Sequence, residues 1–123
     1  MSDDVTMEID GHVVDVIPGP YVHDGKPTAA AREFAAKLIG QLGEMRRYAA
    51  GELLDLYNDT WREGEDPELD EDEFCSRLTN PSITLYDEAG SAAVYFDTSA
   101  MFSDHAIEVW IDGGEIASAS MVG

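Results

Sequence analysis

Positive charge and cysteine are both scarce in this sequence. Seven Lys and Arg residues stand against 26 Asp and Glu, so the 123 residues carry a formal net charge of −19, and no Lys or Arg follows Arg77. A surface this negative repels phosphate groups, which excludes direct binding to nucleic acid or to an anionic membrane. The single cysteine, Cys75, excludes an intramolecular disulfide and a zinc site built from cysteines.

Long apolar runs are absent as well. No segment approaches the roughly 18 consecutive apolar residues of a membrane-spanning helix. The start of the chain also lacks the basic and apolar regions of a signal peptide. Hydrophobic residues make up 44% of the chain, which is too many for a disordered protein. We therefore expect one folded domain, residues 1–123, that is soluble in the cytoplasm.

The N-terminal segment, residues 4–17, has the pattern of a β-hairpin. Val5, Met7 and Ile9 alternate with polar residues, and Asp10-Gly11 supplies a two-residue turn. Pro18-Gly19-Pro20 then ends the second strand, because proline has no N–H to donate to a sheet. The pattern leaves open whether this hairpin joins the sheet expected in the C-terminal half.

Residues 28–78 form a helical region, because apolar side chains recur there three or four positions apart. Interspersed glycines favour two helices, near 28–42 and 44–62, over a single long one. A short third helix is expected from about Asp70 to Leu78, with Asp70 as its N-cap. Asn80-Pro81 is expected to end that helix.

Residues 82–122 have the pattern of a strand meander. Apolar and polar residues alternate, and turn sequences separate the expected strands. The expected strands are Ser82–Tyr86, Ser91–Asp97, His105–Ile111 and Glu115–Met121. The predicted fold is therefore α+β: a mostly antiparallel sheet, made of this meander and the N-terminal hairpin, packed against two to three helices.

Two motifs resemble an uncharacterised bacterial domain family. The first is Leu53-Leu54-Asp55-Leu56-Tyr57-Asn58-Asp59-Thr60-Trp61, followed by Phe74 and Leu78. The second is Met101-Phe102-Ser103-Asp104-His105-Ala106-Ile107-Glu108-Val109, followed by Asp112-Gly113 and Gly123. The similarity covers roughly residues 50–123. Small acidic α+β domains of this kind often resemble immunity proteins, which neutralise toxins delivered between competing bacteria. The resemblance implies such a role and supplies no catalytic residue.

The negative charge is concentrated in one stretch of the chain. Between Glu52 and Glu73 there are eleven carboxylates and one basic residue, Arg62. Such a stretch attracts basic proteins, and salt weakens the attraction over about 10 Å. The alternative is that the acid serves solubility alone, as in halophilic proteomes. The carboxylates that we predict to bind a partner are Glu52, Asp55, Asp59, Glu63, Glu65 and Asp66.

Three aromatic residues form a second candidate for partner binding. Tyr86, Tyr95 and Trp110 each lie one position away from an expected core residue on a C-terminal strand. If the helices cover the core face of the sheet, these rings lie on the other face among carboxylates. Aromatic anchors surrounded by charge are typical of protein interfaces. The alternative is that another layer, such as the first hairpin or a second subunit, covers them.

No pattern of catalytic or metal-binding residues emerges. An EF-hand loop started at Asp66 fails, because Glu71 falls where glycine is required and Arg77 where the bidentate Glu belongs. The histidines have no metal-site spacing, and His105 is expected at the margin of the core. Cys75 is expected to be a buried packing residue. We therefore predict a protein without enzymatic activity, cofactor or metal.

The leading hypothesis is an immunity-type inhibitor that occludes a basic toxin. A nuclease is an attractive target, because its cleft is built to hold phosphate. A second hypothesis is a DNA mimic that blocks a DNA-binding protein, and a third is a structural module that forms a homodimer. All three predict a protein partner in place of nucleic acid or membrane.

Overall fold

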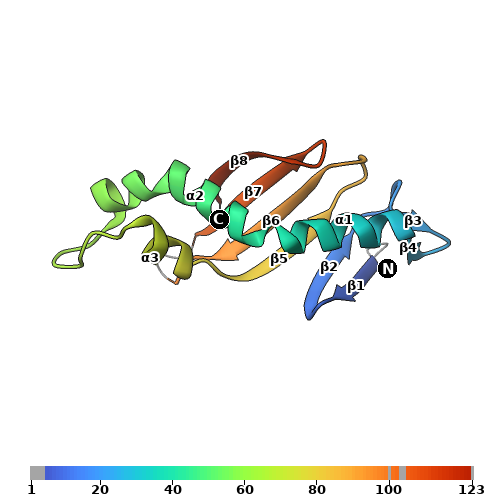
Figure 1. Ribbon diagram of the computed structural model, residues 1–123, viewed down its shortest axis with the longest axis horizontal. Coiled ribbons are helices and arrows are strands. Elements are labelled where there is room, and N and C mark those ends of the chain that lie inside the picture. The colour runs from blue at the N-terminus through green and yellow to red at the C-terminus, as the bar shows by residue number, and fades with distance from the viewer. Residues whose placement is uncertain (1–4, 100, 103–104, 123) are drawn as a thin grey trace.

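The computed structural model describes residues 5–99, 101–102 and 105–122, and its main feature is one twisted sheet (Figure 1). The strands of this sheet are β1 (Val5–Ile9), β2 (His12–Val16), β5 (Thr79–Leu85), β6 (Ala92–Asp97), β7 (Ala106–Asp112) and β8 (Glu115–Val122). Within the described residues they form a six-stranded sheet in the order β1-β2-β5-β6-β7-β8. Every neighbouring pair is antiparallel except β2 and β5, which are parallel. The predicted α+β class and mostly antiparallel sheet are confirmed.

The N-terminal hairpin joins this main sheet. Asp10 and Gly11 both have positive φ, 51° and 81°, which is the backbone geometry that a two-residue hairpin turn requires. Val14 and Val16 of β2 lie beside Ile83 and Leu85 of β5, and all four side chains are fully buried. Burial of these valines therefore attaches the hairpin to the rest of the sheet. Residue 4 of the predicted hairpin and residues Ser103, Asp104 and Gly123 of the family motif lie outside the described residues.

A second, very short hairpin follows, which was not predicted from the sequence. It consists of β3 (Val22–His23) and β4 (Lys26–Pro27), joined by Asp24-Gly25 with positive φ at both residues. The turn signal is the same Asp-Gly pair as in the first hairpin. Its strands are only two residues long, which is too short for an alternating pattern to appear.

The helices begin and end close to the predicted positions. They are α1 (Ala29–Gly40), α2 (Leu42–Leu56) and α3 (Glu71–Ser76), and α2 continues into one turn of π-helix, η1 (Tyr57–Trp61). Asp70 is the N-cap of α3, as predicted, and accepts a hydrogen bond of 2.8 Å from the Glu73 N–H. The π-helical turn was not predicted.

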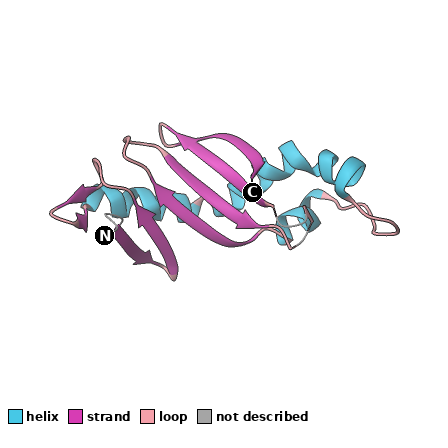
Figure 2. Ribbon diagram, turned by 180° about the vertical axis from the view of Figure 1, so that it is seen from behind, coloured by secondary structure: helices cyan, strands magenta, loops and turns pink. Residues whose placement is uncertain are grey.

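All these helices lie on one face of the sheet, and Figure 2 shows the other face with the helices behind it. Alternate strand residues point toward the helices and form the core, together with apolar helix residues such as Leu38, Met45 and Phe74. The fully buried strand residues of this core include Val14, Val16, Ile83, Leu85, Val94, Phe96, Ile107, Val109 and Ile111. The molecule therefore has two layers, and one face of its sheet carries no helix in the described part of the chain.

One predicted boundary was wrong. Asn80-Pro81 does not precede a strand but lies inside β5, which begins at Thr79 and contains a bulge between Thr79 and Ser82. Proline is tolerated here because β2 pairs with β5 only from Ile83 onward, so no neighbour requires the missing N–H.

Each helix of the described residues is too short or too polar to cross a membrane.

Candidate protein-binding surfaces

The first candidate surface is the acidic segment, which we define as residues Glu52–Glu73. It runs along α2, through η1, around a loop and into α3, and its loop projects beyond the end of the sheet (Figure 1). All six carboxylates that the sequence predicted here are exposed: Glu52, Asp55, Asp59, Glu63, Glu65 and Asp66. The structure therefore places this predicted group on one continuous stretch of helix and loop.

Two side chains hold the loop of the acidic segment in place. The Asn58 side chain binds both backbone groups of Leu69: its Nδ2 donates to the Leu69 carbonyl and its Oδ1 accepts from the Leu69 N–H, each at 3.0 Å. Arg62 donates to the carbonyls of Asp66 and Asn58, at 2.7 and 3.3 Å. Leu69 itself is only 5% exposed. The loop is thus braced from inside, although the sequence analysis assigned no role to Asn58.

The ion pairs of this region leave the predicted carboxylates uncompensated. Arg47 pairs with Glu71 at 3.0 Å, and Arg62 lies 3.7 Å from Glu68. Both pairs involve carboxylates in the later part of the segment. Among the described residues, none of the six predicted carboxylates forms an ion pair. Their charge is therefore available to a partner.

The second candidate surface is the aromatic cluster of Tyr86, Tyr95 and Trp110. These rings lie on the face of the sheet opposite the helices, as the alternation predicts. The Tyr86 and Trp110 ring centroids are 5.2 Å apart, and the hydroxyl oxygens of Tyr86 and Tyr95 are 3.5 Å apart. Each ring remains partly exposed. The structure therefore brings together three residues that are up to 24 positions apart in the sequence.

Carboxylates surround the aromatic cluster. Glu108 lies between Tyr95 and Ser120 in the strand register, on the same outer face. The pKa of the Tyr95 hydroxyl is raised above its ordinary value, first by the hydrogen bond with Tyr86 and then by burial and by hydrogen bonding with Glu108. Tyr95 is therefore a neutral hydrogen-bonding group at physiological pH. By strand alternation and register, the carboxylates of the outer face are Glu8, Asp15, Asp97, Glu108, Asp112 and Glu115.

The two surfaces are separate. The acidic segment belongs to the helical layer and extends past the end of the sheet, whereas the aromatic cluster lies on the bare face (Figures 1 and 2). The nine predicted residues therefore form two groups, six carboxylates and three rings, which do not share one face of the molecule.

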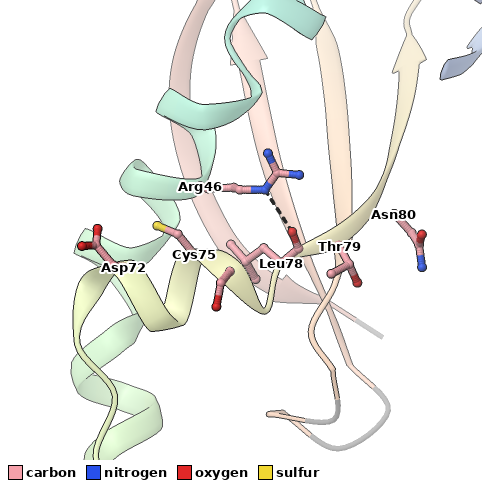
Figure 3. Close-up of a pocket in the computed structure, with 7 residues that line it drawn as sticks. Arg46, Asp72, Cys75, Leu78, Thr79 and Asn80 are labelled. Carbon is pink, nitrogen blue, oxygen red and sulfur yellow. Dashed lines mark hydrogen bonds between the residues drawn. The ribbon is translucent and has the colours of Figure 1, made fainter. Parts of the chain in front are cut away.

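A surface depression lies where α2, α3 and the start of β5 meet (Figure 3). The Arg46 guanidinium crosses it, donating a 2.9 Å hydrogen bond to the Leu78 carbonyl, and lies 5.1 Å from the centre of the Phe96 ring. Cys75 lines this depression and is partly exposed, which corrects the prediction of a buried residue. The pKa of its thiol is raised, first by burial and then by Glu71, so the thiol stays protonated and is a weak nucleophile.

His105 lies at the margin of the core, as predicted. It is partly exposed, and its ring meets the Trp61 ring edge-on, with centroids 5.7 Å apart. Trp61 in turn packs against Phe102. Among the described residues, no group of three His, Cys, Asp or Glu side chains is arranged to hold a metal ion.

Comparison with protein families gives one result. The family described as "uncharacterized protein conserved in bacteria (DUF2262)" matches residues 21–121. The match includes both candidate surfaces and begins after the first hairpin. No curated protein and no solved structure matches the chain.

Proposed function

The chain belongs to this family of uncharacterised bacterial proteins, and we propose that it is a small non-catalytic binding protein that inhibits a basic toxin. The observation that supports this proposal most directly is the set of six exposed carboxylates without ion pairs, three on α2 and η1 and three on the loop braced by Asn58 and Arg62. The proposal places the protein in the cytoplasm, where an immunity-type inhibitor meets a toxin that has entered the cell.

The proposed mechanism is occlusion of the toxin's active site. Carboxylates on the acidic segment attract Lys and Arg around that site and increase the rate of association at low salt. A nuclease fits this mechanism well, because its cleft already carries positive charge for phosphate. The brace matters because carboxylates held in place lose less conformational freedom on binding than carboxylates on a mobile loop.

Two observations favour a different protein as the partner over a second copy of this chain. The exposed edge strand β8 has a bulge at Ala117, whose carbonyl accepts a hydrogen bond of 3.2 Å from the Tyr48 hydroxyl. A bulge of this kind disfavours strand pairing between two copies. In addition, two copies carrying −19 each repel one another.

The test is a pull-down from lysate of the source organism with three forms of the protein. The first is wild type, and the second carries Asp55→Asn, Asp59→Asn, Glu63→Gln and Glu65→Gln. The third is a control with the same net charge as the second form, in which four exposed turn carboxylates outside both surfaces are neutralised. The control substitutions are Asp10→Asn, Asp24→Asn, Asp87→Asn and Glu88→Gln.

We expect wild type and the control to capture one basic protein in stoichiometric amount at low salt and to lose it near molar salt. The acidic-segment variant should lose this capture while remaining folded. Expression of the captured protein should be toxic to cells, and co-expression of the chain should relieve this toxicity. A captured DNA-binding protein without toxicity would support the DNA-mimic hypothesis instead. Equal capture by both variants, or only a salt-sensitive mixture of ribosomal proteins, would refute the proposal.

A further inference from the structure

We infer that the bare face of the sheet is a second binding surface, which receives arginine side chains of a basic protein on the aromatic cluster. In this arrangement a guanidinium group stacks on the Trp110 ring and its N–H groups point to the Glu108 carboxylate. This inference stands apart from the proposed function, because it concerns the opposite layer of the molecule and does not require the partner to be a toxin.

The side chains of the aromatic cluster pack against one another in the chain without a partner. Its rings contact one another, and the two tyrosine hydroxyls are within hydrogen-bond range. Ala93 pairs with Trp110 across the strands on the same outer face, and it is 0% exposed although it is not part of the core. We infer that the rings cover it. A ring that is held in place loses little conformational entropy when a partner stacks on it.

The chemistry of the face indicates what binds there. Small polar side chains surround the rings, so the face is unlike the apolar surface of an obligate subunit interface. The strands of the six-stranded sheet contain no Lys or Arg, so every charged side chain they place on this face is a carboxylate. The small polar residues of this face include Ser82 opposite Tyr95, Ser118 opposite Trp110, Ser120 opposite Glu108, and Thr84.

Charge complementarity then selects the occupant. A second copy of this chain would place carboxylate against carboxylate, and nucleic acid would place phosphate against carboxylate. A cationic protein surface is complementary to both the rings and the carboxylates. Arginine fits better than lysine, because its planar guanidinium stacks on an aromatic ring while its N–H groups bind a carboxylate in the same plane.

The test compares nona-arginine with nona-lysine, two peptides of equal length and charge. Both are titrated into the acidic-segment variant described above, which reduces binding elsewhere, and the two tryptophan indole N–H signals are followed by NMR. The chain has only Trp61 and Trp110, and a Trp61→Phe variant assigns the signals. We expect tighter binding of nona-arginine and a shift of the Trp110 signal, while the Trp61 signal stays in place.

Substitutions at the face provide the second measurement. We expect Trp110→Leu to weaken nona-arginine binding about tenfold, the size expected for loss of a partly desolvated cation–π contact, and to change nona-lysine binding less than twofold. Glu108→Gln, which keeps the shape and a hydrogen-bond acceptor, should also reduce the preference for arginine. Phe34→Leu is the matched control, because Phe34 is a partly buried ring of α1 that lies outside both surfaces and packs against Tyr21.

The possible results separate this inference from the proposed function. Equal affinity for both peptides, or an unmoved Trp110 signal in the folded acidic-segment variant, would overturn the inference and leave the inhibitor proposal standing. If Trp110→Leu fails to fold, the Trp110 signal in the acidic-segment variant and the Glu108→Gln variant still decide the matter. If the acidic-segment variant prefers nona-arginine to nona-lysine, the inference is supported. If that variant also keeps full capture of its partner, the inhibitor proposal fails and the inference alone is supported.

Discussion

Replacing Asn58 by Ala removes one of the two side chains that brace the loop of the acidic segment. The Asn58 side chain is partly buried and binds both the N–H and the carbonyl of Leu69, at 3.0 Å each. In the Asn58→Ala variant these two backbone groups have no side-chain partner at position 58. The substitution leaves every carboxylate of the segment in the sequence, so it changes the geometry of the loop without changing its charge.

The expected loss of stability follows from these two contacts. A typical hydrogen bond contributes about 1 kcal/mol net, so two contribute about 2 kcal/mol. Alanine has the higher helix propensity, which returns about 0.5 kcal/mol at a helical position. We therefore expect Asn58→Ala to lower the free energy of unfolding by about 1.5 kcal/mol. Thr60→Ala, at an exposed position in the same π-helical turn, is the matched control and should stay within about 0.5 kcal/mol of wild type.

Urea unfolding measures the stability change, and hydrogen exchange localises it. In wild type the Leu69 amide should be protected, because it donates to Asn58 and Leu69 itself is buried. In the variant this amide should exchange faster, while amides in β6 and β7 change only as much as the global stability does. Unchanged stability together with unchanged protection at Leu69 would refute the idea that Asn58 holds the loop.

Other predictions concern the turns, the helix and the thiol. Gly90 has φ of +82°, and an added Cβ would lie 3.0 Å from the Gly113 Cα. Gly90→Ala should therefore reduce the free energy of unfolding by about 1–2 kcal/mol and lower the melting temperature. Gly51 lies inside α2 with open space around it, so Gly51→Ala should increase the free energy of unfolding by about 1 kcal/mol and raise the melting temperature. The raised pKa of Cys75 predicts slower alkylation by iodoacetamide at pH 8 in the folded chain than in urea; equal rates would contradict it. Because the pKa of the Cys75 thiol is higher in the folded chain than its ordinary value of 9.0, the unfolded chain loses this proton first as the pH rises. The contribution of the thiol to the free energy of unfolding is therefore intact below pH 9.0 and is lost above it. Urea unfolding at a series of pH values would detect this loss.

Features that depend on local sequence could be predicted. The Asp10-Gly11 turn, the N-cap at Asp70 and the break between α1 and α2 each follow from a few neighbouring residues. The outer position of Tyr86, Tyr95 and Trp110 follows from strand alternation, because a strand places successive side chains on opposite faces. That the three rings meet also depends on the register of β5, β6 and β7, in which Tyr95 lies opposite Glu108 and Trp110 opposite Ala93.

Features that depend on distant contacts could not be predicted. The parallel pairing of β2 with β5 joins residues 14–16 to residues 83–85 and buries Val14 and Val16. No residue pattern near either strand indicates that the two strands pair. The π-helical turn η1 places Asn58 opposite Leu69, 11 positions later, and an asparagine in a helix has no pattern that reveals this contact. The separation of the two surfaces likewise follows from which face of the sheet the helices cover.

The distribution of the basic residues bears on whether the acidity serves binding or solubility. A carboxylate that serves solubility works equally well on any exposed turn, and it needs no fixed position. In this chain, however, Arg47 and Arg62 pair with later carboxylates of the acidic segment, and Arg62 and Asn58 also fix the loop that carries three of the unpaired ones. This arrangement keeps charge uncompensated and in place at a cost in stability through repulsion, which supports the proposal that something cationic binds there. The two variants of equal net charge separate the explanations: solubility alone predicts that they behave alike, whereas binding predicts that only the acidic-segment variant loses its partner.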